Sequence, residues 1–299
     1  MKRALAALFA GSLWTLVAAG TVPVDPPPVD LPPVDLPRTA PVPGGVAVVP
    51  LGPLTRPVSA VRYGKRPVML RRDGEQWVAV VGIPLAAKVG EHHLDVTVDG
   101  RVRRVSFRVR PMQYAEQRLT IRNRRMVEPT QKDLERIWRE KKIIGRSFAT
   151  FSPAPPPSLR FIPPVDGRYS SPFGLRRFFN GKPRKPHSGL DIAAPEGTPI
   201  RAPAPGVVLT TGNYFFNGNT VFLDHGNGLV SMFCHMNRID VKPGQRLARG
   251  AVLGRVGKTG RVTGPHLHWS VSLNNTRVDP GLFLSAPPVK GAPTPPVAE

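Results

Sequence analysis

Proline is the residue that most restricts how this chain can fold, because its 37 prolines are concentrated in three segments. They are dense in residues 21–57, 153–164 and 287–296 and sparser in the two stretches between them. A proline has no backbone N–H to donate and fixes its own φ angle, so such segments favour extended, spacer-like chain. We therefore expect folded structure in two regions, about 45–125 and 165–284.

The first region has the pattern of short antiparallel strands. Residues 77–81 form an apolar run, and residues 93–98 and 102–109 alternate between polar and apolar side chains. Asp99-Gly100, between the last two runs, is typical of a tight hairpin turn. Short strands with turn signals at this spacing predict a small N-terminal β-sandwich over residues 45–125.

A helix is predicted after this sandwich, within a segment of helix and proline-rich linker that occupies residues 126–164. It begins after Thr130, where Asp133 completes a weak capping box. We expect its apolar stripe to pack against the rest of the protein. That stripe consists of Leu134, Ile137 and Trp138.

The second region reads as a glycine-rich β domain with no helical periodicity of useful length. Gly226-Asn227-Gly228 predicts a hairpin turn between two of its strands. The predicted strands are residues 207–209, 220–223, 229–234, 252–256 and 267–273. The fold class is therefore mainly β, with an antiparallel C-terminal domain.

Five of the seven histidines lie in this second region. In residues 267–273 the apolar side chains alternate with polar ones, so a strand places His266 and His268 on one face, opposite the core. His187 and Asp191 come from a separate segment. Imidazole nitrogens and a carboxylate oxygen are ligands that suit zinc, and a catalytic zinc takes three protein ligands. Spacing alone offers more than three candidates and does not choose between His266 and His268.

Five ordered segments give this region a specific resemblance. They are residues 171–176, 187–200, 224–228, 233–236 and 259–268, and they include the motifs His-Ser-Gly-Leu-Asp and Gly-Pro-His-Leu-His. Over roughly 167–284 the chain resembles the lysostaphin/LytM-type zinc metallo-endopeptidases of bacterial cell walls. The resemblance implies the antiparallel β fold of that family and hydrolysis of the peptide part of peptidoglycan by a water molecule that zinc activates.

The resemblance also assigns roles to single residues. It implies that one zinc ion per chain is bound by His187, Asp191 and His268. It implies that His235 and His266 are catalytic histidines that do not bind the metal. Arg176 matches an arginine that the family often has beside its groove, which suggests substrate binding.

Two other reactive residues are interpreted as structural. His225 lies in a predicted turn, and Cys234 lies in a predicted strand where burial is the ordinary explanation. The chain departs from the family pattern at Trp269-Ser270, where Phe-Glu is commoner, and in Phe-Cys-His-Met around His235, where Tyr-x-His-Leu is commoner. Neither departure replaces an implied ligand.

The first region resembles, less specifically, the N-terminal β domain that precedes this catalytic module in some Gram-negative proteins. Residues 43–51 and 114–120 carry that resemblance. Positioning of substrate, binding of a partner and covering of the groove all remain open as its role.

The two ends of the chain are expected to be non-globular. Residues 1–19 combine a basic start, a short apolar run and small residues, which predicts a secretory signal peptide; an uncleaved anchor is the alternative. Residues 20–44 read as a proline-rich spacer and residues 285–299 as a disordered tail. No other segment is apolar enough to span a membrane. We therefore expect an exported, periplasmic or otherwise extracytoplasmic protein.

The charge of the chain limits its partners. A formal net charge of +22 favours an anionic partner, such as bacterial cell wall, acidic lipid or nucleic acid. Export and the lack of any nucleic-acid motif argue against nucleic acid. The single cysteine excludes an intramolecular disulfide. The family resemblance and the predicted export together imply the peptide stems of peptidoglycan as the target, with D-Ala–diaminopimelate as the expected cross-link. No regulatory partner is identified, and the alternative function is a silent module that activates a cell-wall amidase.

Overall fold

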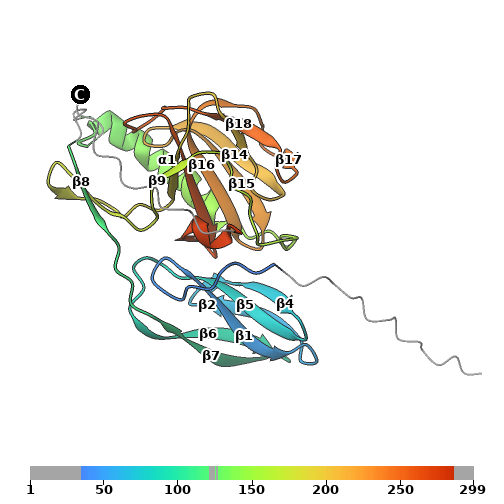
Figure 1. Ribbon diagram of the computed structural model, residues 1–299. Coiled ribbons are helices and arrows are strands. Elements are labelled where there is room, and N and C mark those ends of the chain that lie inside the picture. The colour runs from blue at the N-terminus through green and yellow to red at the C-terminus, as the bar shows by residue number, and fades with distance from the viewer. Residues whose placement is uncertain (1–34, 121–124, 126, 286–299) are drawn as a thin grey trace, which may run out of the picture. The chain divides into compact units, whose positions relative to one another are not determined.

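The computed structural model describes residues 35–120, 125 and 127–285 (Figure 1). The predicted signal peptide, most of the predicted spacer and all but the first residue of the predicted tail lie outside the described residues. Within the described part, no helix is long and apolar enough to cross a membrane.

Two antiparallel sheets form the first region, as the strand pattern predicts. One has the order β1-β5-β4 and the other β3-β2-β6-β7. The strands are β1 (Val46–Pro53), β2 (Val58–Tyr63), β3 (Arg66–Pro67), β4 (Met69–Asp73), β5 (Gln76–Gly82), β6 (Gly90–Val98) and β7 (Arg101–Val109). Asp99 and Gly100 both have positive φ, at 49° and 71°, as a tight β6–β7 hairpin requires. The β-sandwich prediction is confirmed, although the strands of the two sheets end at Val109, short of the predicted boundary at residue 125.

A single core holds these strands together. Its fully buried members include Val81, Ile83, Leu94 and Val96, each with 0 % of its surface exposed. Because Leu94 and Val96 are two residues apart on β6, they share one face, and that face is buried. The alternation of apolar and polar residues in the sequence therefore correctly identifies the buried face of β6.

A ten-stranded sheet dominates the second region. Its main path is β17-β14-β15-β16-β19-β12-β9; β20 pairs with β19, and β18 pairs with β13 and β16. The bounds are β9 (Arg168–Ser171), β12 (Leu190–Ala193), β13 (Pro199–Arg201), β14 (Gly206–Tyr214), β15 (Gly218–Gly226), β16 (Leu229–Ile239), β17 (Arg246–Leu247), β18 (Val252–Val256), β19 (His266–Leu273) and β20 (Thr276–Val278), followed by the 3-10 turn η2 (Pro280–Phe283). All neighbouring strands in it are antiparallel.

The predicted features of this sheet are confirmed. Asn227 and Gly228 form the β15–β16 turn with φ angles of 47° and 80°. On β19, Leu267, Trp269 and Val271 are fully buried in the core of this region. The alternate residues His266 and His268 therefore occupy the opposite face of β19, as the sequence pattern predicts.

A second, small sheet has the order β11-β10-β8, from β8 (Glu116–Leu119), β10 (Arg176–Phe179) and β11 (Lys182–Pro183). β10 and β11 form a short hairpin, and β8 pairs with β10 in parallel. The hairpin lies directly before the His-Ser-Gly-Leu-Asp motif in the chain, and His187 forms backbone hydrogen bonds with Gly174 and Leu175, which directly precede the hairpin.

Helix α1 (Gln131–Ala149) begins as predicted, but its buried face differs from the prediction. Thr130 caps the helix, and Asp133 completes the capping box. Only Ile137 of the predicted stripe is buried; Leu134 is 38 % exposed and Trp138 is 61 % exposed. The buried contact lies near the other end of the helix, where Phe148 packs edge-to-face on Phe222 of β15. The prediction failed because residues 134 and 138 flank the buried face instead of defining it.

The proline-rich segment after α1 is not the spacer that its composition predicts. Leu159 and Phe161 are buried in the core of the second region, at 0 % and 1 % exposure. The Phe161 ring lies 4.9 Å from the His225 ring and 5.3 Å from the Phe283 ring. Two large apolar side chains among the prolines pack into this core, and the Phe161 N–H donates to the Phe283 carbonyl, so proline content alone misled the prediction.

Candidate metal centre

The site is built on the register of two neighbouring strands. β12 and β19 are antiparallel, and Asp191 lies directly opposite His268. Directly opposed residues project to the same face of a sheet. Asp191 Oδ1 lies 2.8 Å from His268 Nδ1, although the residues are 77 positions apart in the chain.

His187 reaches the same point from the loop that precedes β12. Its Nε2 lies 2.9 Å from Asp191 Oδ1 and 3.0 Å from His268 Nδ1. Gly189 makes this approach feasible, because a Cβ atom there would lie 2.7 Å from two atoms of the His268 ring. The glycine of the His-Ser-Gly-Leu-Asp motif is thus a geometric requirement, because the loop passes too close to the His268 ring for a residue with a side chain.

These three side chains fit a zinc ion. Their candidate ligand atoms lie within 4.8 Å of one another, and this is the one such cluster of His, Cys, Asp and Glu side chains found among the described residues. His187 Nδ1 donates to the Pro172 carbonyl at 2.7 Å, which leaves its Nε2 without a hydrogen and aimed at the cluster. His268 turns Nδ1 toward the cluster and Nε2 toward the Ser270 hydroxyl, 2.9 Å away. Two imidazole nitrogens and a carboxylate oxygen are a common catalytic zinc set.

Electrostatics keep the cluster in the state that metal binding needs. Burial by itself would raise the pKa of Asp191, but the charges and hydrogen bonds of His187 and His268 outweigh burial and hold that pKa well below its usual range. Burial lowers the pKa of His268 to about 4, against the opposing effect of Asp191. At neutral pH the pair is therefore an ionised carboxylate and a neutral imidazole, which are the ligand forms.

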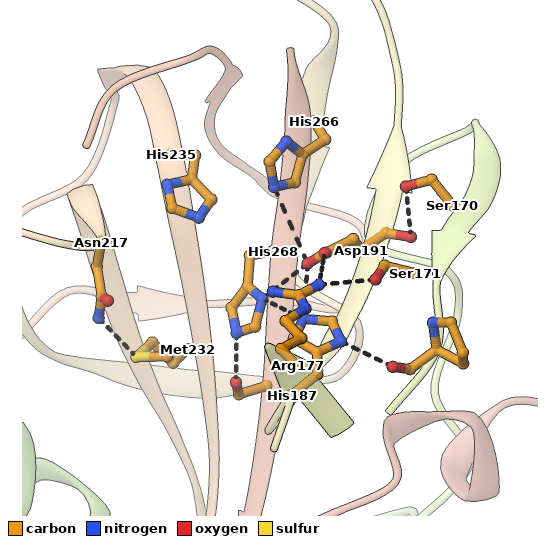
Figure 2. A network of polar contacts seen from close by, with 12 residues as sticks. Ser170, Ser171, Arg177, His187, Asp191, Asn217, Met232, His235, His266 and His268 are labelled. Carbon is orange, nitrogen blue, oxygen red and sulfur yellow. Dashed lines mark hydrogen bonds and ion pairs between the residues drawn. The ribbon is translucent and has the colours of Figure 1, made fainter. Parts of the chain in front are cut away.

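His235 and His266 lie beside the cluster without joining it (Figure 2). Their ring centroids are 4.9 Å apart, and His235 is 6.0 Å from the His268 ring. His266 Nε2 lies 3.9 Å from Asp191 Oδ1. The structure thus brings together all five histidine and aspartate residues to which the resemblance assigns a role.

His235 reaches this face through an unusual backbone conformation. Its φ is +65°, in the left-handed region that residues with a side chain rarely adopt. Cys234 is paired with His268, so regular alternation would turn His235 away from the site. Instead, the pairing of β16 with β15 shifts register between Phe233 and Met236, and both of these side chains are buried in the core. The irregular backbone at His235 therefore re-aims its imidazole toward the site.

Both flanking histidines have a fixed tautomer. His235 Nδ1 donates to the Thr259 carbonyl, and His266 Nδ1 donates to the Gly264 carbonyl, each at 2.9 Å. In each neutral ring, Nε2 is then the proton acceptor. Burial, with smaller effects from His268 and His266, lowers the pKa of His235 to about 3, so this ring is neutral at physiological pH.

The arginine that contacts the cluster is Arg177, whereas the family resemblance suggested its neighbour Arg176. Its Nη2 lies 3.0 Å from Asp191 Oδ2 and 2.7 Å from Ser171 Oγ. It thereby occupies the second oxygen of Asp191 and leaves Oδ1 to the histidines. The neighbouring Arg176 pairs instead with Glu116, at 3.2 Å, and its side chain is 61 % exposed. A strand predicted over residues 176–179 would have identified Arg177, because alternation along a strand places Arg177 on the same face as the buried Phe179.

His225 and Cys234 lie outside the centre, in agreement with their structural interpretation. The buried His225 ring bonds the Pro205 carbonyl and the Ser231 hydroxyl, at 2.8 Å each. Cys234 packs among the side chains of a separate apolar cluster that includes Phe148 and Phe222. Burial raises the pKa of its thiol, which disfavours the reactive thiolate.

Two family models match the chain. Peptidase family M23 matches residues 185–280, which include every residue of the centre described above except Ser171, Pro172 and Arg177. The N-terminal domain of peptidase family M23 matches residues 39–111, the region of sheets β1-β5-β4 and β3-β2-β6-β7.

Similar proteins agree with these models. A crystal structure from Pseudomonas aeruginosa assigned to peptidase M23 is 47 % identical, covers 83 % of this chain and 96 % of its own, and has a TM-score of 0.70. Peptidoglycan DD-endopeptidase ShyA of Vibrio cholerae is 42 % identical over 39 % of this chain and 28 % of its own length. DD-carboxypeptidase/endopeptidase Mpg of Neisseria meningitidis is 42 % identical over 40 % of this chain and 27 % of its own length. The chain thus spans little more than a quarter of these curated relatives.

Proposed function

The chain belongs to peptidase family M23, and we propose that it is an exported, zinc-dependent endopeptidase that hydrolyses peptide cross-links of bacterial peptidoglycan. The observation that carries this proposal is the convergence of His187, Asp191 and His268, with ligand atoms 2.8–3.0 Å apart, beside two further histidines with fixed tautomers. A peptidase of this kind needs a metal and a base beside it, and the arrangement provides residues for both.

In this proposal one zinc ion is held by His187 Nε2, Asp191 Oδ1 and His268 Nδ1. Bound zinc supplies Lewis-acid polarisation and a hydroxide-like nucleophile near neutral pH. Pro172 and Ser270 hold the two imidazoles in the required orientation. Arg177 neutralises the second oxygen of Asp191, which favours a single-oxygen contact from that carboxylate.

His235 and His266 handle the protons. Their Nδ1 atoms are committed to backbone carbonyls, so Nε2 of each ring accepts a proton from the attacking water and later donates one to the leaving amine. A protonated ring also donates a hydrogen bond to the oxygen on which negative charge develops. Their separation of 4.9 Å between centroids lets them act on the two sides of one peptide group.

The substrate class follows from the relatives. ShyA is named a peptidoglycan DD-endopeptidase, and Mpg is named a DD-carboxypeptidase/endopeptidase. We therefore propose the D-Ala–diaminopimelate cross-link as the bond and an extracytoplasmic compartment as the place of action. The net charge of +22 favours retention on the anionic wall. The alternative, a silent module that activates an amidase, would be expected to lack a ligand, and all three ligands are present here.

Metal analysis of two variants tests the assigned roles. His268→Ala removes a ligand and is expected to lose bound zinc and activity. His266→Ala keeps the three ligands and is expected to retain about one zinc per chain while losing activity by about 100-fold or more. Zinc content by mass spectrometry of the purified proteins distinguishes the two. Equal loss of zinc from both variants would contradict the division between ligands and proton-transfer residues.

A further inference from the structure

Three arginines gather at the edge of the metal centre. Arg177 touches Asp191, and Arg184 stands opposite Arg177 on the β10–β11 hairpin, where its backbone N–H donates to the Arg177 carbonyl at 2.9 Å. Arg177, Phe179 and Arg184 therefore share one face of the hairpin. The guanidinium carbon of Arg261 lies over the Phe179 ring, 5.3 Å from its centroid, and 4.4 Å from the Phe216 centroid.

The two hairpin arginines of this cluster, Arg177 and Arg184, carry more positive charge than the single acidic side chain that they contact among the described residues. Asp191 is the acidic partner of Arg177, and it is shared with two histidines. Arg184 donates to the Val127 carbonyl, which carries no net charge. Burial first, and then the charges of Arg177 and Arg184, lower the pKa of Arg261 to about 10. Guanidinium groups this close repel one another, and an incoming anion would relieve that repulsion.

Unused hydrogen-bond donors point the same way. The Nε atoms of Arg177 and Arg184 are both buried, and neither has a hydrogen-bond acceptor among the described residues. A buried donor without a partner costs free energy, which is a reason to expect a ligand there. The planar fork of a guanidinium group matches a carboxylate, to which it can donate two parallel hydrogen bonds.

We propose that Arg177, Arg184 and Arg261 form a subsite for a substrate carboxylate next to the scissile bond, with Arg184 and Arg261 as its main binding residues. This inference rests on the proposed function. In a D-Ala–diaminopimelate cross-link, the carbon attached to the scissile nitrogen also carries a free carboxylate. Because Arg177 contacts the metal-binding Asp191, a carboxylate held by this cluster lies on the substrate immediately beside the reacting amide.

The subsite makes the enzyme selective for the residue that supplies the nitrogen of the scissile amide. A cross-link to diaminopimelate supplies the carboxylate, whereas amidation of that carboxyl removes its charge. A cross-link to the ε-amine of lysine, or to glycine within a peptide, has no carboxylate at this position. We therefore expect the arginine cluster to reject those substrates by leaving charged donors unpaired.

The test compares two substrates in the same protein. A muropeptide dimer with the free carboxyl and the same dimer amidated at that carboxyl are hydrolysed by the zinc-loaded protein. The wild type is expected to prefer the acid by about 10- to 100-fold in kcat/KM, mainly through KM. Arg184→Gln and Arg261→Gln are each expected to reduce that preference to a few-fold, because each lowers kcat/KM for the acid dimer and leaves kcat/KM for the amidated dimer unchanged. Arg249→Gln, the same charge change at an exposed residue between β17 and β18, is the matched control.

The preference is a ratio within each variant, so partial unfolding does not alter it. A calorimetric titration of a diaminopimelate stem peptide, as acid and as amide, gives a second readout that needs no turnover. Equal hydrolysis of both dimers by the wild type would overturn the subsite and leave the proposed function standing. Tighter binding of the acid without hydrolysis of either dimer would support the subsite and overturn the proposed function. Arg184→Gln and Arg261→Gln variants that slow both substrates equally would show a structural role instead.

Discussion

At the scale of single residues, the most informative feature is the backbone of His235. A non-glycine residue at a φ of +65° carries strain of roughly 1–2 kcal/mol, which the surrounding sheet must offset. The strain coincides with the point where the side chain turns to the metal centre and where Met236 returns to the core. The position of the His235 side chain is therefore obtained at the expense of local stability.

Replacement of His235 by asparagine separates these two effects. Asparagine tolerates the left-handed conformation, and its side-chain amide can still donate to the Thr259 carbonyl. We expect His235→Asn to keep or slightly raise the melting temperature while it lowers peptidase activity by about 100-fold or more. His235→Ala, which has the strain without the donor, is the control and should melt lower. A large fall in melting temperature for His235→Asn would contradict the strain argument.

The buried His225 gives the fold a pH dependence. Burial lowers its pKa to about 4, against 6.5 for a free histidine. Below pH 6.5 the unfolded chain binds a proton that the folded chain excludes, so the stabilising contribution is full above that pH and is lost as the pH falls toward 4. The free energy of unfolding should lose about 2 kcal/mol from this residue between pH 7.5 and pH 5.

Urea unfolding at the two pH values measures the effect. His225→Gln has no titrating ring, so the difference between wild type and variant isolates His225 from all other groups. An identical pH dependence in the two proteins would show that the ring is not held neutral.

At the scale of strands and helices, local patterns were predicted from the sequence and long-range register was not. Alternation along residues 267–273 placed His266 and His268 on one face, and turn residues identified the hairpins at Asp99-Gly100 and Asn227-Gly228. The opposition of Asp191 and His268 depends on strand pairing across 77 residues, which no local pattern contains. The choice of His268 over His266 as ligand came from the family resemblance for the same reason.

Two residues of the site depended on details that spacing does not carry. Arg177 was missed because the short strand β10 was not predicted, and a one-residue difference on a strand reverses the face. The bulge at His235 was missed because its sequence has no glycine or other signal of positive φ. Both are tertiary features, in which packing overrides local preference.

Helix α1 offers a direct test of the corrected buried face. Phe148 is 2 % exposed and packs on Phe222, whereas Trp138 is 61 % exposed. Phe148→Ala should lower the free energy of unfolding by about 3 kcal/mol or more, and Trp138→Ala by about 0.5 kcal/mol or less. Chemical denaturation of the two variants compares them directly. A larger loss of unfolding free energy for Trp138→Ala than for Phe148→Ala would contradict this buried face and support the stripe predicted from the sequence.

At the scale of the whole molecule, sequence, fold and comparisons agree on one enzyme family. The family matches cover the region of sheets β1-β5-β4 and β3-β2-β6-β7 and all of the ten-stranded sheet except β9. The P. aeruginosa structure extends the similarity to 83 % of the chain. The strongly basic chain suits a polyanionic substrate, and the arginine cluster concentrates part of that charge at the metal centre. The five residues to which the resemblance assigns a role thus meet at one face of the ten-stranded sheet, four of them on its strands and His187 on the loop before β12.

Digestion of cross-linked peptidoglycan sacculi is the most direct test of this account. The zinc-loaded protein is incubated with sacculi, with and without a zinc chelator, and the released muropeptides are separated by chromatography and identified by mass spectrometry. We predict conversion of cross-linked dimers to monomers at the D-Ala–diaminopimelate bond, abolished by the chelator and restored by added zinc. Persistence of the dimers while one zinc remains bound per chain would contradict the account, as would cleavage that the chelator does not affect.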